Sequence, residues 1–117
     1  MIVYLNGRYV DESDAKISPF DRGFLYGDGV FETLKCLKGK PIFLKEHINR
    51  LRNGLKVLKI ELEEDYKCFK DIIKNLLKLN NLENYSAYVR ITVSRGVTTT
   101  LKDFESEKST VFVFVKQ

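Results

Sequence analysis

The chain has 117 residues, of which 44% are hydrophobic and 31% charged, and its formal net charge is +4 at pH 7. This length and composition are typical of one globular domain. The basic residues are scattered among 16 acidic ones and form no long run, which disfavours nucleic-acid binding. The sequence shows no signal peptide and no long uncharged apolar run, so we expect a cytoplasmic protein that does not span a membrane.

The cysteine and histidine content argues against a disulfide framework or a metal site. Cys36 and Cys68 lie far apart in the sequence and form no CxxC pair, so we expect free thiols that pack against apolar neighbours. His47 is the single histidine. We therefore predict no metal binding and expect His47 to make a structural hydrogen bond.

The first part of the chain predicts two β-hairpins. Asn6-Gly7 supplies the two positive-φ positions of a tight turn, and residues 38–40 supply a second turn. Because Pro41 cannot donate a backbone hydrogen bond, we expect it at a strand start or on an edge. The four expected strands are 2–5, 8–10, 30–37 and 41–44.

Residues 18–34 are expected to form a tight, partly buried joint before the second hairpin. Gly23, Gly27 and Gly29 can take positive φ or admit a close neighbour. The apolar run 24–26 between them is expected to face inward. Such a loop forms a pocket wall, an interface or a packed turn, and the residues alone leave these open. The glycine spacing does not fit a dinucleotide-binding fingerprint.

The middle of the chain predicts two amphipathic helices. Apolar residues recur at spacings of three and four over residues 45–58 and again over 64–79. The second helix starts with acidic residues and ends with lysines, which complements a helix dipole. Gly54 inside the first helix is expected to mark close approach to a neighbouring backbone.

Two further strands are expected at 87–94 and 110–115, separated by a polar loop at 95–109. The last strand is apolar on both faces, so it should be central or covered on both sides. Because nothing follows it, we expect that the chain was cut from something longer. Together the elements predict an α+β fold, with an antiparallel sheet of five or six strands and two helices packed on one face.

Three arginines are candidates for binding an anion. Arg50 follows His47 by three residues on one side of a helix, where it is either a solvated charge or a phosphate ligand. Arg90 alternates with Tyr88 on one face of a strand, and if buried it needs either a structural carboxylate or an anionic substrate. Arg95, in the following loop, is a weaker candidate of the same kind. No catalytic set of side chains can be recognised from the residues alone.

Five sequence motifs occur in order along the chain. They are Asn6-Gly7, SPFDRGFLYGDGVFET at 18–33, EHINRL at 46–51, YVR at 88–90 and SRG at 94–96. Taken together, they resemble the small N-terminal domain of class IV aminotransferases. These fold-type IV pyridoxal-phosphate enzymes include branched-chain and D-amino-acid aminotransferases and 4-amino-4-deoxychorismate lyase.

The resemblance implies a cytoplasmic homodimer that uses pyridoxal 5′-phosphate and acts on small amino acids, keto acids or aminodeoxychorismate. In such an enzyme a lysine forms a Schiff base with the cofactor, which acts as an electron sink. Arg50 would contact the cofactor phosphate, and Tyr26 would reach across the dimer interface. An arginine such as Arg90 or Arg95 would neutralise the substrate carboxylate. The residues expected to line the substrate pocket are Tyr26, Phe31, Tyr88, Arg90 and Arg95.

The chain also departs from the family pattern. In the family the Schiff-base lysine and most of the phosphate cup lie in a larger C-terminal domain that these residues do not include, so we assign no catalytic residue and expect the chain alone to be inactive. Phe31 replaces the tyrosine expected in D-amino-acid enzymes, and amino transfer and pyruvate elimination both stay open. The alternatives are a stand-alone dimerisation or interaction domain and a small-anion-binding module that uses Arg50 and Arg90.

Overall fold

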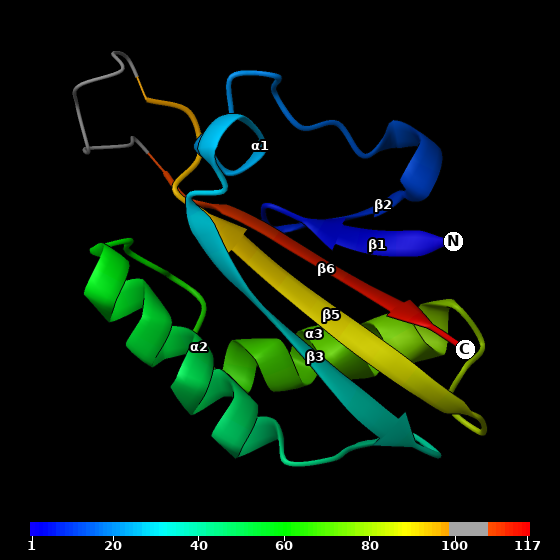
Figure 1. Cartoon of the computed structure of the whole chain (residues 1–117). Helices are drawn as coiled ribbons and strands as arrows, with labels where there is room; N and C mark the ends of the chain where they lie inside the picture. Colours follow the sequence, from blue (N-terminus) through cyan, green and yellow to red (C-terminus); the bar gives the residue numbers. More distant parts are fainter. Residues whose placement is uncertain (99–107) are drawn as a thin grey trace.

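A computed structural model of the chain describes residues 1–98 and 108–117 (Figure 1). The strands are β1 (Ile2–Leu5), β2 (Arg8–Asp11), β3 (Gly29–Leu37), β4 (Lys40–Pro41), β5 (Ser86–Ser94) and β6 (Thr110–Lys116). The helices are the 3-10 turn η1 (Glu12–Asp14), the short α1 (Arg22–Tyr26), α2 (Leu44–Leu58) and α3 (Tyr66–Leu79). No helix in the described residues is both long and apolar enough to cross a membrane.

The six strands form one antiparallel sheet in the order β2-β1-β6-β5-β3-β4. The long helices α2 and α3 lie on the same face of this sheet, as Figure 1 shows. The predicted α+β fold is therefore confirmed. The predicted polar loop at 95–109 lies mostly outside the described residues, which exclude 99–107.

The first hairpin is confirmed and the second is shorter than expected. Asn6 and Gly7 have φ values of 49° and 89°, as the turn between β1 and β2 requires. In the second hairpin only Lys40 and Pro41 pair with β3, so a strand over 41–44 is wrong. Leu44 is instead the first residue of α2 and is 5% exposed, because its side chain fills the core beneath the sheet.

The joint between the hairpins contains a helix that the sequence did not indicate. The carboxylate of Asp21 caps α1 by accepting a hydrogen bond from the Gly23 amide at 2.8 Å, and Gly27 ends the helix with φ 65°. The expectation that residues 24–26 face inward is wrong: Phe24 is 75% exposed and Tyr26 55%.

Polar contacts hold α1 against the sheet in place of its aromatic side chains. The buried carboxylate of Asp21 accepts hydrogen bonds from the Ser94 and Thr110 hydroxyls, each at 2.6 Å. These bonds connect the start of α1 to the adjoining ends of β5 and β6. Gly29 lies where β3 approaches β5 closely, since a Cβ there would lie 2.5 Å from the Val93 carbonyl oxygen.

The core lies between the helices and one face of the sheet, and the two amphipathic helices are confirmed. The helix α3 begins at residue 66 because the Asp65 side chain caps it, accepting from the Cys68 amide at 2.8 Å. Gly54 of α2 does mark a close approach, but to the Val30 side chain and not to a backbone. The core side chains of the two helices are Leu44, Ile48, Leu51, Leu55, Phe69, Ile72, Ile73, Leu76 and Leu77.

The strand β6 is central, as predicted, but the long helices cover only one of its faces. Its valines are buried under the helices, whereas Phe112 and Phe114 are only half-buried on the opposite face. The two cysteines also differ. Cys36 is fully buried, and burial raises the pKa of its thiol to about 11. The expected packing role is wrong for Cys68, which is exposed.

Two leucines of α3 provide a matched test of this core. Leu76 is fully buried and Leu79 is 50% exposed. We expect Leu76→Ala to lower the free energy of unfolding by about 2–5 kcal/mol, because it leaves a cavity. Leu79→Ala should cost less than about 1 kcal/mol. Urea unfolding measures both, and equal losses would contradict the assigned face of α3.

Candidate functional site

The alternation of β3 places its neighbouring side chains on opposite faces of the sheet. Glu32 faces the helices and is 3% exposed, whereas Phe31 faces the other side and is 57% exposed. β3 pairs with β5 along its whole length, with Phe31 opposite Thr92 and Thr33 opposite Arg90. The two strands therefore supply one group of candidate residues to each face.

On the helix side, the buried carboxylate of Glu32 contacts His47 and Arg50 of the EHINRL motif. Arg50 donates side-on to it, from Nε to Oε1 at 2.5 Å and from Nη2 to Oε2 at 2.7 Å. Nδ1 of His47 lies 2.8 Å from Oε2. The expectation that His47 and Arg50 share one side of the helix is confirmed, and so is the structural hydrogen bond of His47.

These contacts also set the charge state of Glu32. The hydrogen bond from Arg50 lowers the pKa of Glu32 below its usual range, burial opposes this shift, and His47 adds to the lowering. The hydrogen bond to Glu32 likewise raises the pKa of Arg50. Glu32 is thus a carboxylate at neutral pH, and it fixes the guanidinium of an otherwise exposed side chain.

Arg50 keeps donors available for a ligand. Glu32 occupies Nε and one Nη2 proton, and within residues 1–98 and 108–117 Nη1 has no protein partner. The side chain of Arg50 is 75% exposed. A guanidinium held on one edge and open on the other can bind a phosphate with two parallel hydrogen bonds.

The opposite face of the sheet carries the YVR motif and Phe31. The guanidinium of Arg90 lies 3.9 Å from the centroid of the Phe31 ring, and Tyr88 packs edge-on against Phe114 at 6.2 Å. A buried salt bridge was one expectation for Arg90. It is wrong, because Arg90 is half-buried and has no carboxylate partner in the described part of the chain. A cation lying over an aromatic ring is stabilised without such a partner.

Arg95 has a different environment from Arg90. It is 5% exposed, and its guanidinium donates from Nε to the Asp28 carboxylate at 2.7 Å and from Nη2 to the Leu58 carbonyl at 2.6 Å. Burial alone would raise the pKa of Asp28, but hydrogen bonds from Arg95 and Arg22 outweigh it and lower the pKa. These contacts fix the loop after α1. A substrate contact from Arg95 stays a prediction.

The structure brings the predicted residues together in three places. Arg50 lies on the helix face of β3, and Phe31, Tyr88 and Arg90 gather on the opposite face. Tyr26 and Arg95 line a separate hollow at the end of α1. β4 pairs only with the last two residues of β3, so residues 29–34 form an edge without a second neighbouring strand in the described structure. The first two groups lie on either side of this edge.

Three acidic residues of the site escaped the sequence analysis. Glu32 carried a signal, since it is the one charged residue among the otherwise apolar side chains on the buried face of its strand. Asp21 and Asp28 each lie close before a glycine, but nothing in the sequence shows which hydroxyls or arginines they bind.

The fold and the clustered motifs define a family. Residues 29–117 match the model of the amino-transferase class IV family, and the chain belongs to it. It corresponds to the N-terminal part of its relatives.

Two curated relatives and one solved structure illustrate the similarity. The chain is 44% identical over 119 aligned residues to aminodeoxychorismate lyase of Bacillus subtilis, with 99% of the chain and 40% of the relative covered. It is 47% identical to a putative branched-chain-amino-acid aminotransferase of Methanocaldococcus jannaschii, with 83% and 33% covered. The T.th. branched-chain amino acid aminotransferase, complexed with N-(5′-phosphopyridoxyl)-L-glutamate, aligns with a TM-score of 0.85 and 28% identity. That alignment covers 97% of this chain and 39% of the other.

Replacing Glu32 by glutamine tests how much its carboxylate, bound to Arg50 and His47, stabilises the fold. The variant should lose on the order of 1–3 kcal/mol of unfolding free energy at neutral pH. Because the folded-state pKa is lowered, the carboxylate stabilises the fold above the unfolded pKa of about 4.3. This stabilisation is lost as pH falls through the folded-state pKa. Urea unfolding at neutral and at acidic pH should show the difference between wild type and variant shrinking in acid.

Glu61→Gln is the control for this measurement, because Glu61 is exposed and makes no hydrogen bond or ion pair in the described structure. It should change stability by less than about 0.5 kcal/mol. A Glu32→Gln variant with the same pH dependence as the wild type would show that the carboxylate does not carry the stabilisation.

Proposed function

We propose that the chain is the N-terminal small domain of a pyridoxal-phosphate-dependent class IV aminotransferase or aminodeoxychorismate lyase. In this proposal it supplies one contact to the cofactor phosphate and the contacts to the substrate carboxylate. A larger C-terminal domain supplies the Schiff-base lysine. The chain spans 33–40% of the two curated relatives described above, which leaves room for such a domain in the complete enzyme.

The observation that carries the proposal is the held guanidinium of Arg50. Glu32 fixes it in a side-on pair, and its free donors are open to solvent. An arginine held in this way fits a phosphate, because little conformational freedom is lost when the ligand binds. Pyridoxal phosphate would supply an electron sink for bond changes at the substrate Cα.

The open face of the sheet would bind the substrate. Arg90 lies there without a carboxylate partner in the described residues, so its guanidinium is available to a substrate carboxylate. Phe31 and Tyr88 lie beside it and would contact the rest of a small amino acid, keto acid or aminodeoxychorismate. The contact with Phe31 restricts the orientation of Arg90 before a substrate arrives.

We also propose that the complete protein is a cytoplasmic homodimer, with Tyr26 reaching into the partner's site. Exposed aromatic side chains are consistent with this, since Phe20 is 69% and Phe24 75% exposed in the same segment of the chain as Tyr26. A stand-alone interaction domain without catalysis is the alternative. The same exposed aromatics would support it, because exposed apolar side chains are typical of interfaces.

The coding sequence beyond the codon for Gln117 separates these two functions. We expect the reading frame to continue for roughly another domain and to encode a lysine shortly after a strand. The whole product should then release pyruvate from aminodeoxychorismate or transfer an amino group from a branched-chain amino acid to a keto acid. A stop codon directly after Gln117 would favour the interaction domain.

In the whole product, Arg50→Ala is expected to weaken pyridoxal-phosphate affinity by about ten- to a hundredfold, the usual effect of removing a charged hydrogen bond. Equilibrium dialysis of the cofactor measures this. Arg8→Ala is the matched control, since Arg8 is exposed on β2 and lies in neither candidate group. Unchanged affinity in Arg50→Ala would contradict the assigned phosphate contact.

Arg90→Ala tests the substrate contact separately. We expect KM for the carboxylate substrate to rise about tenfold or more while cofactor affinity stays at the wild-type level, because Arg90 lies on the opposite face of the sheet from Arg50. Steady-state kinetics with saturating cofactor give the result. An unchanged KM would remove Arg90 from the substrate pocket.

A further inference from the structure

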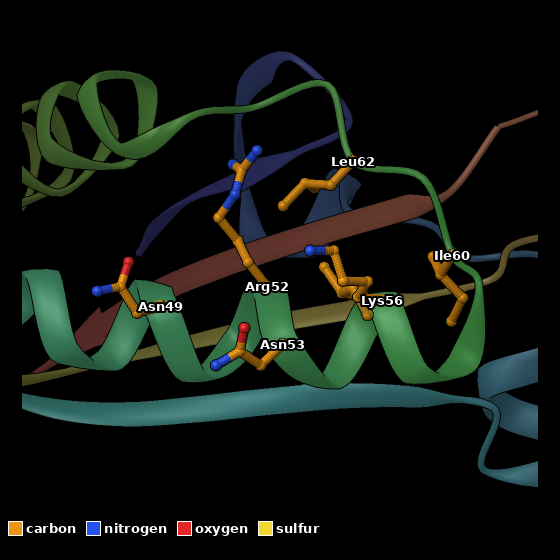
Figure 2. A pocket seen from close by; sticks show the side chains of 7 residues that line it. Asn49, Arg52, Asn53, Lys56, Ile60 and Leu62 are labelled. Carbon is orange, nitrogen blue, oxygen red and sulfur yellow. The ribbon is translucent and has the colours of Figure 1, made fainter.

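A groove away from the candidate site lies along the outer side of α2, where the chain returns from this helix toward α3. Figure 2 shows Arg52 and Lys56 leaving the helix on the side of the segment that carries Leu62. The groove has a volume of about 580 Å³. Its lining residues are Asn49, Arg52, Asn53, Leu55, Lys56, Ile60 and Leu62.

The groove combines two cations with two amides. Arg52 and Lys56 are four residues apart, as are Asn49 and Asn53, so each pair occupies adjacent turns of one helix face. Arg52 donates one hydrogen bond, from Nη1 to the Glu64 carbonyl at 3.2 Å. Neither cation has an ion-pair partner within residues 1–98 and 108–117.

The acidic segment beside the groove makes no ion pair with these cations in the described residues. The carboxylate of Glu63 lies 3.6 Å from the Lys108 ammonium, and that of Glu64 accepts a hydrogen bond from the Tyr4 hydroxyl at 3.2 Å. Asp65 caps α3, and this bond to Cys68 is the main cause of its lowered pKa, to which Arg52 adds only a smaller part. Of these three carboxylates, only Glu63 is paired with a cation, whereas Glu64 and Asp65 each hydrogen-bond a neutral group.

The groove also has an apolar side. Ile60 and Leu55 are almost completely buried below it, and Leu62 is half-buried at its rim. A ligand that placed an anionic group between the two cations could rest an apolar portion against Leu62. Arg50 is two residues from Arg52 and points about 200° away around the helix, so the groove shares no donor with the proposed cofactor contact.

We propose that this groove is a second binding site, which takes a phosphate monoester with an apolar organic portion. A phosphate monoester carries a charge of about −1.5 to −2 at neutral pH, which balances one arginine and one lysine, whereas a carboxylate balances only one of them. Three oxygens can accept from the guanidinium, the ammonium and the amide of Asn53 or Asn49 together. The organic portion contacts Leu62.

Phenyl phosphate is a suitable probe, titrated into the ¹⁵N-labelled chain and followed by the side-chain amide signals of Asn49 and Asn53. We expect saturable shifts and tighter binding of phenyl phosphate than of inorganic phosphate, because only the former covers Leu62. Arg52→Gln and Lys56→Gln should each weaken binding about tenfold, as expected for one charged hydrogen bond. Lys70→Gln, on the exposed side of α3, is the control and should leave affinity unchanged.

Three outcomes would overturn the proposal. They are the absence of saturable shifts at the two asparagines, equal affinity in wild type and both groove variants, and loss of binding in Arg50→Gln alone. The last result would place the probe at the proposed cofactor contact. Because the side chain of Lys56 is exposed, its variant keeps the test valid if Arg52→Gln does not fold. The cofactor affinity of Arg50→Ala tests the proposed function independently of this groove.

Discussion

The pairing of β3 with β5 fixes the position of most side chains in the candidate site. Nine consecutive residue pairs hold the two strands in one register, from Gly29 opposite Ser94 to Leu37 opposite Ser86. A slip of one residue would move Glu32 to the open face and bury Phe31 under the helices. The close approach at Gly29 and the apolar helix face of β5 both exclude that slip. Strand register therefore places Glu32 on the helix face of the sheet, beside Arg50, and Phe31 on the opposite face.

The buried carboxylate of Glu32 fixes the orientation of the exposed Arg50 guanidinium. Burying a carboxylate is unfavourable unless it is paired, and Arg50 and His47 together satisfy it. The same pairing fixes a guanidinium whose other edge faces solvent. Asp21 and Asp28 act in a comparable way at the end of the sheet, where hydroxyls and arginines hold α1 and leave its aromatics outside. Three buried or half-buried carboxylates thus determine how the surface of the site is presented.

Sequence reasoning predicted the elements whose residues repeat with a clear period. The turn at Asn6-Gly7, the two amphipathic helices and the long strands follow from local preferences that tertiary contacts reinforce. The helix α1 was missed because five residues are too few to show a helical period, and its stability comes from the Asp21 cap. The strand expected at 41–44 failed because Leu44 is needed in the core at the start of α2.

By itself, the sequence determined the fold class, the family and the residues of the motifs, because periodicity and motif spacing are properties of the chain. Only the tertiary structure decided what those residues contact. Arg90 and Arg95 are five positions apart and both basic, yet one lies over an aromatic ring and the other is buried against Asp28. Contacts between distant segments depend on strand register and helix placement, and a local pattern cannot specify them.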